Sequence, residues 1–333
     1  MKIAVDVMGG DFAPQEILLG AQKFAETGEA ELILVGRQVD IVRILPQLPK
    51  GCEIVDTPEV IEMGEPPASA LRKKKNASVA LAARLVKEGK AVGFLSAGST
   101  GAQMAASLME IGRIPGAERP PIAVVMPTLR ETGMVVLDVG ANVDCKPQHL
   151  VQFAIMGGAY FERLYKLPSA RIGLLNVGSE AGKGNELAKA AYPLLEQSGL
   201  NFVGNVEPDH MVEGVCDVLV CDGFDGNILL KTSEGISDAV VNAVKKGIAK
   251  AGVDPVMAKA IFSELQRFRV DAPEYSGAPL LGIAGGSIVC HGKAKAPVIA
   301  HALHLAAQFS STDVIGLIAQ RLSKNAAGVS LSQ

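Results

Sequence analysis

The amino-acid sequence predicts a three-layer α/β protein, with helices on both faces of a mostly parallel sheet that also contains an antiparallel pair. Three observations support this fold class. Short apolar runs that are typical of buried strands alternate with longer amphipathic stretches over most of the 333 residues. Glycine-rich loops follow many of these runs. Two neighbouring runs, 121–128 and 133–140, are joined by a short polar segment that is typical of a β-hairpin.

The expected elements follow one another along the chain. Strands are expected at 2–8, 31–36, 91–98, 121–128, 133–140, 171–175, 200–204 and 216–221, and as a short pair within 276–292. Helices are expected at 14–27, at 77–90, 101–112, 187–197, 226–250, 254–269 and 296–321, and two more run through Ile44 and through Tyr165.

The domain organisation is inferred from the even composition of the chain. No internal repeat, low-complexity linker or shift in composition marks a boundary. We therefore expect a single domain over residues 1–325, which can have two lobes, and a C-terminal tail at 326–333. Within the domain, apolar residues recur at helical spacing over 252–269 and form an amphipathic element.

Composition excludes several classes of function. Hydrophobic residues make up 48% of the chain and charged residues 20%, which is typical of a globular protein with a large core. Aromatic residues are scarce at 4% and the net charge is −3, so we expect no nucleic-acid partner. Asp6 comes too early for a secretory signal and no apolar stretch is long enough to span a membrane, which predicts a cytoplasmic protein. Five scattered cysteines predict reduced thiols, without disulfides or zinc.

Six loops that leave predicted strands are rich in small and polar residues. They cover 6–14, 96–102, 137–144, 176–186, 221–231 and 290–297. In open α/β sheets, ligands bind outside the carboxyl ends of the strands. Backbone N–H groups at helix starts attract anions, and glycine allows a ligand to approach the backbone. The six loops therefore predict a site for phosphate.

The loop "NVGSEAGKGNE" (176–186) combines three glycines with one lysine, yet it matches neither common phosphate motif. A P-loop needs four residues between its glycines, and then a lysine followed by serine or threonine. Here three residues separate Gly178 from Gly182, and Gly184 follows Lys183. The dinucleotide fingerprint needs a third small residue where this chain has Leu187. Neither motif therefore supports ATP hydrolysis or hydride transfer.

Taken together and in order, the loop sequences resemble the bacterial phosphate acyltransferase (PlsX) family. The resemblance runs from residue 1 to about residue 323 and rests on the ordered set "DVMGGD", "SAGSTGA", "LDVGAN", "NVGSEAGKG", "GNVEP", "CDGFDGN", "GAPLLG" and "HGK". One departure lies in "RKKKNAS" (72–78), where Asn76 and Ala77 replace the acid and serine expected from the family pattern.

The resemblance implies a fold similar to phosphotransacetylase and to the isocitrate and isopropylmalate dehydrogenases. It implies transfer of a long acyl chain from acyl carrier protein to inorganic phosphate, which gives acyl-phosphate for phospholipid (phosphatidic acid) synthesis, with no cofactor and no metal. It also implies a homodimer and a functional link to a membrane glycerol-3-phosphate acyltransferase. A metal- and NAD-dependent decarboxylating dehydrogenase of similar fold is the alternative, and a non-catalytic scaffold at the membrane surface is a third hypothesis.

The chemistry assigns roles to residues of these loops. Phosphate needs positioning more than deprotonation, and the developing oxyanion needs hydrogen-bond donors. The candidate catalytic residues are Lys183 for phosphate, Asn227 for the oxyanion, and His291 for protonation of the departing thiolate. The candidate substrate-binding residues are Gly9, Gly10, Ser99, Thr100, Gly101, Asn142, Ser179, Gly182, Gly184, Gly226 and Lys293.

Other interpretations stay open at this stage. Lys183 could neutralise nearby glutamates, and His291 could be structural. The aspartates of the loops could gather around Mg²⁺, although capping of turns and helices is favoured. The basic run 72–75 is either a solvated face or a docking surface for an acidic carrier protein. The amphipathic element at 252–269 either packs in a core or dimer, or makes a peripheral contact with a membrane.

Overall fold

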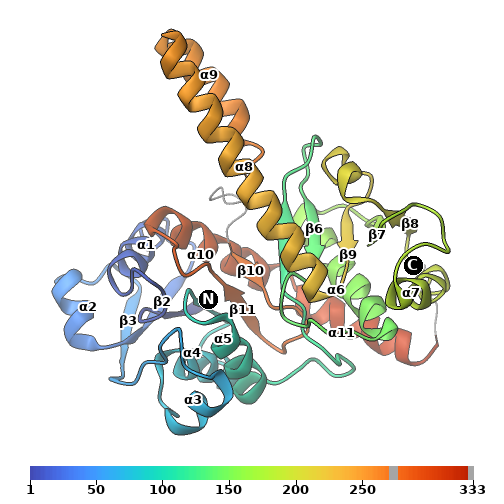
Figure 1. Cartoon of the computed structure of the whole chain (residues 1–333). Helices are drawn as coiled ribbons and strands as arrows, with labels where there is room; N and C mark the ends of the chain where they lie inside the picture. The colour runs from blue at the N-terminus through green and yellow to red at the C-terminus, as the bar shows by residue number, and fades with distance from the viewer. Residues whose placement is uncertain (270–276, 329–333) are drawn as a thin grey trace.

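The computed structural model describes residues 1–269 and 277–328. In these residues the strands form two sheets (Figure 1). The first sheet has the order β10-β11-β4-β1-β2-β3. Its strands are β1 (Lys2–Asp6), β2 (Glu31–Gly36), β3 (Cys52–Asp56), β4 (Gly93–Ser96), β10 (Ala278–Pro279) and β11 (Gly286–Val289). All pairs are parallel except β10 with β11.

The second sheet has the order β5-β6-β9-β7-β8. Its strands are β5 (Ala123–Met126), β6 (Met134–Leu137), β7 (Ile172–Leu175), β8 (Phe202–Val206) and β9 (Val218–Val220). Only β5 and β6 are antiparallel, so the predicted hairpin at 121–140 is confirmed. The sequence predicted one sheet, whereas the structure has two, connected by isolated antiparallel bridges such as Ile122–Leu280.

Helices cover the faces of both sheets, which confirms the predicted α/β class. Those of the first half of the chain are α1 (Gln15–Ala25), α2 (Gln38–Ile44), α3 (Pro67–Lys73), α4 (Ser78–Lys87) and α5 (Thr100–Ala106), and α5 continues as a π-helical turn. Those of the second half are α6 (Pro147–Tyr165), α7 (Glu186–Glu196), α8 (Gly223–Ala251), α9 (Pro255–Gln266), α10 (Ala296–Ser311) and α11 (Val314–Ala326). Helix α6 is largely buried, and its residues Phe153, Tyr160 and Phe161 are fully buried.

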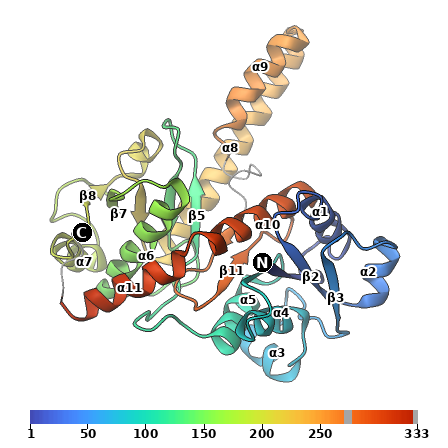
Figure 2. The ribbon, with the colours of Figure 1, turned by 180° about the vertical axis from the view of Figure 1, so that it is seen from behind.

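The C-terminal helix predicted at 296–321 is two helices. The chain bends by 53° between α10 and α11, where Asp313 takes a left-handed φ of 48° and its carboxylate accepts a hydrogen bond from Gly316 N. In the view from behind, α10 crosses in front of the first sheet, and α11 lies beside α6 of the second (Figure 2). The end of the expected tail, 329–333, lies outside the described residues.

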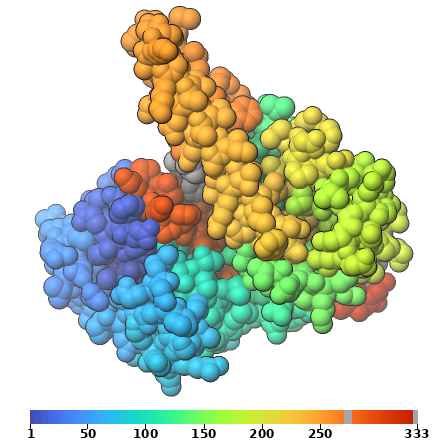
Figure 3. All heavy atoms as spheres, viewed as in Figure 1, coloured from blue at the N-terminus to red at the C-terminus, as the bar shows by residue number. Residues whose placement is uncertain are grey.

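Helices α8 and α9 form an arm that stands away from the body (Figures 1 and 3). Of all the residues in α8 and α9, only Gly223, Gly226 and Val241 are buried, and all three belong to α8. Within the described residues, no single helix has the length and apolar character to cross a membrane. The bent pair α10–α11 meets that test by length and composition alone.

Candidate functional site

The loops after β1, β4 and β11 meet at one edge of the first sheet. The strands end in register, because Asp6 pairs with Ser96 and Ser96 pairs with Val289. Asp11 N donates a 2.8 Å hydrogen bond to the carbonyl of Gly292, which joins the first of these loops to the third. These segments, 6–14, 96–102 and 290–297, are called the first loop group below.

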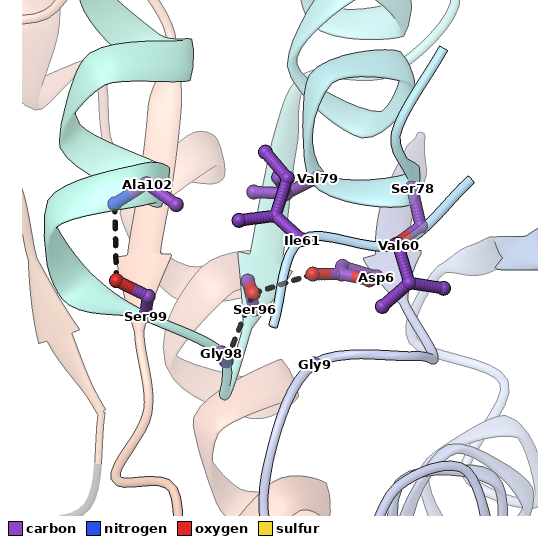
Figure 4. Close-up of a pocket in the computed structure, with 10 residues that line it drawn as sticks. All are labelled: Asp6, Gly9, Val60, Ile61, Ser78, Val79, Ser96, Gly98, Ser99 and Ala102. Carbon is purple, nitrogen blue, oxygen red and sulfur yellow. Dashed lines mark hydrogen bonds between the residues drawn. The ribbon is translucent and has the colours of Figure 1, made fainter. Parts of the chain in front are cut away.

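A buried carboxylate holds this group together. Asp6 accepts a 2.7 Å hydrogen bond from the hydroxyl of Ser96, and the same hydroxyl accepts one from Gly98 N (Figure 4). Burial raises the pKa of Asp6, while hydrogen bonds from Ser78 and Ser96 oppose that rise. The cavity beside Asp6 has a volume of about 10 Å³, which is enough for no more than a water molecule. This corner of the loop group therefore has a structural role.

The candidate residues of the first loop group lie around that carboxylate. A Cβ at Gly9 would lie 2.7 Å from both Oδ2 of Asp6 and Gly98 N, so close packing requires glycine there. Gly10 has a φ of 119°, in a region where glycine is favoured. Ser99 caps α5 by accepting a hydrogen bond from Ala102 N, and Thr100 and Gly101 follow it, exposed, in the first turn.

The exposed loop after β11 presents His291 and Lys293. Lys293 N donates a 3.1 Å hydrogen bond to Nδ1 of His291. A neutral imidazole that accepts at Nδ1 carries its proton at Nε2, so His291 presents an N–H donor toward solvent. Nearby, the Lys295 ammonium lies 5.6 Å from the centre of the Phe12 ring.

The loops after β6, β7 and β9 form the second loop group: 137–144, 176–186 and 221–231. Its centre is the buried Asp138, whose carboxylate accepts hydrogen bonds from the backbone N–H of Ile122 and of residues 140–142. Asn142 is also buried, and its side chain donates to Asp138 and to the carbonyl of Pro120 at 2.9 Å each. The candidate Asn142 therefore has its amide N–H groups engaged in holding this loop.

Asn227 is partly exposed near the start of α8. Asp222 caps this helix by accepting hydrogen bonds from Phe224 N and Asp225 N. A Cβ at Gly226 would lie 1.9 Å from the carbonyl oxygen of Asp138, so glycine is required where α8 meets the second loop group. Within residues 1–269 and 277–328, the Asn227 amide makes no hydrogen bond, and it lies next to Gly140. It is therefore a donor with no partner in the described chain.

The loop 176–186 is fastened at its base and exposed at its tip. Asn176 donates a 3.1 Å hydrogen bond to the carbonyl of Lys183, and Asn205 donates a 2.8 Å bond to that of Glu180. Ser179, Gly182 and Lys183 are exposed, and Gly184 has a φ of 97°. The Lys183 ammonium lies 4.0 Å from Oε1 of Glu180, at the outer limit of an ion pair. The cation is thus only loosely neutralised.

Two cysteines, Cys221 and Cys290, are the first residues of loops in the two groups, and both are buried. Burial, with Asp138 and Asp222 nearby, raises the pKa of the Cys221 thiol well above its usual value. Burial raises the pKa of Cys290 to about 12. A thiolate is the nucleophilic form of cysteine, so neither residue is prepared to attack a thioester.

Hydrogen bonds join 6–14 to 290–297 in the first loop group, and 137–144 to 221–231 in the second. In the described part of the chain, no hydrogen bond or ion pair joins the first loop group to the second. Lys183 and Asn227 belong to the second group, whereas His291 and Lys293 belong to the first. The aspartates Asp6, Asp138 and Asp222 accept backbone hydrogen bonds, which confirms the favoured interpretation of these acids as caps.

Sequence reasoning missed an apolar cavity of about 480 Å³ beside the loop 176–186. It is lined by α6, β7, α7 and the first turns of α8. The sequence signal for this cavity was the apolar pair Ile228 and Leu229, which directly follows Asn227. These residues stand on a helix of which only a small part is buried.

Comparison with known proteins places the chain in a family. A family model described as "Fatty acid synthesis protein" matches residues 1–317. The phosphate acyltransferase of Desulfitobacterium hafniense strain Y51 is 47% identical over 329 residues, which cover 97% of this chain and 98% of the relative. The phosphate acyltransferase of Moorella thermoacetica is 49% identical over 310 residues, with 92% and 91% covered.

Solved structures share the fold at low sequence identity. A phosphotransacetylase from Streptococcus pyogenes matches with a TM-score of 0.64 and 18% identity, over 93% of this chain and 94% of that one. A branched-chain phosphotransacylase from Enterococcus faecalis matches with a TM-score of 0.58 and 13% identity, over 94% and 99%. The structural likeness shows the fold, and the sequence matches show the family: the chain belongs to the phosphate acyltransferases.

Proposed function

We propose that this protein transfers a long-chain acyl group from acyl carrier protein to inorganic phosphate and forms the acyl-phosphate used for phospholipid synthesis. The second loop group is the observation that carries the proposal. There, Lys183, the exposed backbone around Gly182 and the Asn227 amide, which has no hydrogen-bond partner among the described residues, belong to loops that leave the carboxyl ends of adjacent strands. The names of the relatives support acyl transfer to phosphate.

The proposed reaction is a direct displacement. A phosphate oxygen forms a bond to the thioester carbonyl carbon, and the carbonyl oxygen takes the negative charge. The C=O bond then reforms, the C–S bond breaks, and the carrier thiolate leaves with the electron pair and takes up a proton. Phosphate is largely a dianion near neutral pH and brings its own nucleophile, so the protein has to supply position and charge stabilisation.

In this proposal each exposed group has one task. Lys183, Ser179 and the N–H groups around Gly182 hold phosphate, because charge-assisted hydrogen bonds favour the dianion. The Asn227 amide donates to the oxyanion. His291 donates its Nε2 proton to the departing thiolate, and Lys293 draws a phosphate oxygen toward the first loop group.

We further propose that an acidic carrier protein docks on the basic run 72–75. Arg72, Lys73 and Lys75 are exposed, whereas Lys74 is engaged with Glu65 and the carbonyl of Val60. Three available cations on one short segment attract an acidic partner even though the whole chain has a charge of −3.

The arm supports a proposal about location and assembly. Helix α9 has no buried residue, and Val256 and Met257 are 77% and 62% exposed. We propose that the apolar face of 252–269 makes a peripheral contact with the membrane, where a glycerol-3-phosphate acyltransferase would take up the product. We also propose that the protein works in the cytoplasm as a homodimer.

The test is an assay for phosphate-dependent release of carrier thiol. The protein is incubated with an acyl carrier thioester, with and without phosphate, and free thiol and acyl-phosphate are measured. The proposal expects equal amounts of both products, and no dependence on NAD or Mg²⁺. Thiol release that requires NAD and Mg²⁺, or that proceeds equally without phosphate, would contradict it.

A further inference from the structure

The 480 Å³ cavity beside the loop 176–186 has an apolar lining. Its volume lies within the range of about 300–1,000 Å³ that is typical of small-molecule sites. Six leucine and isoleucine side chains belong to the lining: Leu150, Leu174, Leu175, Leu187, Ile228 and Leu229. These six residues define the chain pocket.

Most polar side chains at the rim of the chain pocket already have partners from the protein itself. Asn176 donates to the carbonyl of Lys183 and accepts from Val177 N. Asn185 accepts from Ala188 N at 2.8 Å. Asp222 accepts from the first N–H groups of α8. An occupant that needs many hydrogen bonds would therefore leave its own polar groups unpaired, which is costly.

Charge at the rim excludes a second class of occupant. Asp222 and Asp225 both line the cavity, and burial together with the charge of Asp222 raises the pKa of Asp225. Two carboxylates in the lining disfavour an anion inside the cavity itself, which leaves phosphate to the exposed tip of the loop 176–186 around Lys183. A pantetheine arm, with its amides and hydroxyl, is also a poor match for a rim whose polar groups are engaged. A hydrocarbon chain satisfies both conditions.

The position of the chain pocket matches the reacting end of such a substrate. Gly184 and Asn185 belong both to the cavity lining and to the loop that carries Lys183. On α8, Ile228 and Leu229 directly follow Asn227. A chain that fills the cavity would therefore end where the loop 176–186 and the first turn of α8 meet.

We propose that the chain pocket binds the hydrocarbon chain of the acyl group and so sets the preference for chain length. The inference rests on the proposed function, because it assigns a place to the substrate of that reaction. Burial of each methylene contributes about 0.8 kcal/mol, or roughly fourfold in affinity. Affinity should therefore rise with chain length until the pocket is full.

The test measures binding without turnover. S-acyl-N-acetylcysteamine thioesters of increasing chain length are titrated into the full chain by calorimetry, with neither phosphate nor carrier protein present. In the wild type we expect roughly fourfold tighter binding for each added methylene. Affinity that does not change along the series would overturn the proposal.

Two tryptophan variants test where the thioester binds. The chain has no tryptophan of its own, so the fluorescence of an introduced tryptophan reports on that position alone. Leu187→Trp narrows the pocket, whereas Leu167→Trp makes the same change at an exposed site after α6. We expect Leu187→Trp to weaken binding of the longest thioester at least tenfold and to change its emission when the thioester binds. Leu167→Trp should show neither effect. Equal behaviour of the two variants would contradict the assignment.

A third variant keeps the test decisive if Leu187→Trp does not fold. Leu229→Ala enlarges the pocket and should move the chain length that binds most tightly toward longer chains. An unchanged optimum of chain length would count against the assignment of the pocket.

The thiol-release assay separates this inference from the proposed function. Chain-length-dependent binding without thiol release supports the pocket and contradicts the reaction. Thiol release with a chain preference that Leu229→Ala leaves unchanged supports the reaction and contradicts the pocket.

Discussion

The hydroxyl of Ser96 donates a 2.7 Å hydrogen bond to the carboxylate of Asp6, across the ends of two adjacent parallel strands. Both residues are buried. A second oxygen of Asp6 accepts from Met8 N and so turns the chain into the first loop. The pair therefore fixes two glycine-rich loops relative to each other without presenting a charge to solvent.

Replacement of Asp6 by asparagine should flatten the dependence of stability on pH. Burial raises the pKa of Asp6, so the folded state keeps this proton to a higher pH than the unfolded chain, where the pKa is about 3.9. Between those two pKa values the folded state binds more protons, and stability falls as the pH rises. Urea unfolding across a pH series measures this. Asp209→Asn, at an exposed site, is the control, and parallel curves for wild type and Asp6→Asn would contradict the expectation.

Lys183→Ala should raise the phosphate concentration needed for half-maximal rate while the fold stays intact. The lysine is 55% exposed and only loosely paired with Glu180, so its removal costs the fold little. A charge-assisted contact contributes about 1.5–3 kcal/mol, or roughly 10- to 100-fold in apparent affinity. Phosphate titrations of turnover measure the effect. The matched control is Lys189→Ala on α7, and unchanged saturation in Lys183→Ala would remove this lysine from the site.

Asn227→Ala should lower kcat by roughly 10²–10³ with little change in the unfolding midpoint, as for the loss of one oxyanion donor. Its amide has no partner among the described residues, so truncation leaves no buried group unpaired. Asn242→Ala, an exposed position on the same helix, is the control. Single-turnover rates and thermal unfolding separate the two effects. A variant that loses stability and activity in proportion would assign Asn227 a structural role.

The double variant Cys221→Ala, Cys290→Ala should keep its turnover. Both thiols are buried and their pKa values are raised, so neither is present as a thiolate near neutral pH. The wild type is also incubated with labelled acyl carrier thioester in the absence of phosphate and then denatured. We expect no label on the protein. A dead double variant together with retained label would establish an acyl-cysteine intermediate.

Local sequence patterns predicted the strands other than β3, the hairpin at 121–140 and the clustering of loops at sheet edges. They predict these features because periodicity and turn residues act over a few neighbours. The break before Asp313 was not predictable in this way. Residues 312–313 contain neither glycine nor proline, and the helical pattern continues through them. A left-handed Asp313 that caps α11 overrides that pattern.

The sequence predicted only part of the candidate site, because some of its contacts exist only in the folded chain. Asn142 resembles a ligand-binding asparagine in sequence, yet its partners are Asp138 and the carbonyl of Pro120, which only the folded arrangement brings to it. The lining of the chain pocket comes from several elements between Leu150 and Leu229, so no single stretch of sequence predicts the pocket. By contrast, the cap at Asp222 depends on the next three residues and could be inferred from them.

The uninterrupted length of α8 fixes a distance. Asn227 lies near its start, and the chain leaves the helix after Ala251 at the far end of the arm. At 1.5 Å per residue, the 29 residues of α8 span about 43 Å. From Asn227 to Ala251 the helix sets a separation of about 36 Å between the proposed oxyanion site and anything that the tip of the arm touches. Inserting one helical turn beyond Val241 would lengthen that reach by about 5 Å and leave the residues around Asn227 unchanged.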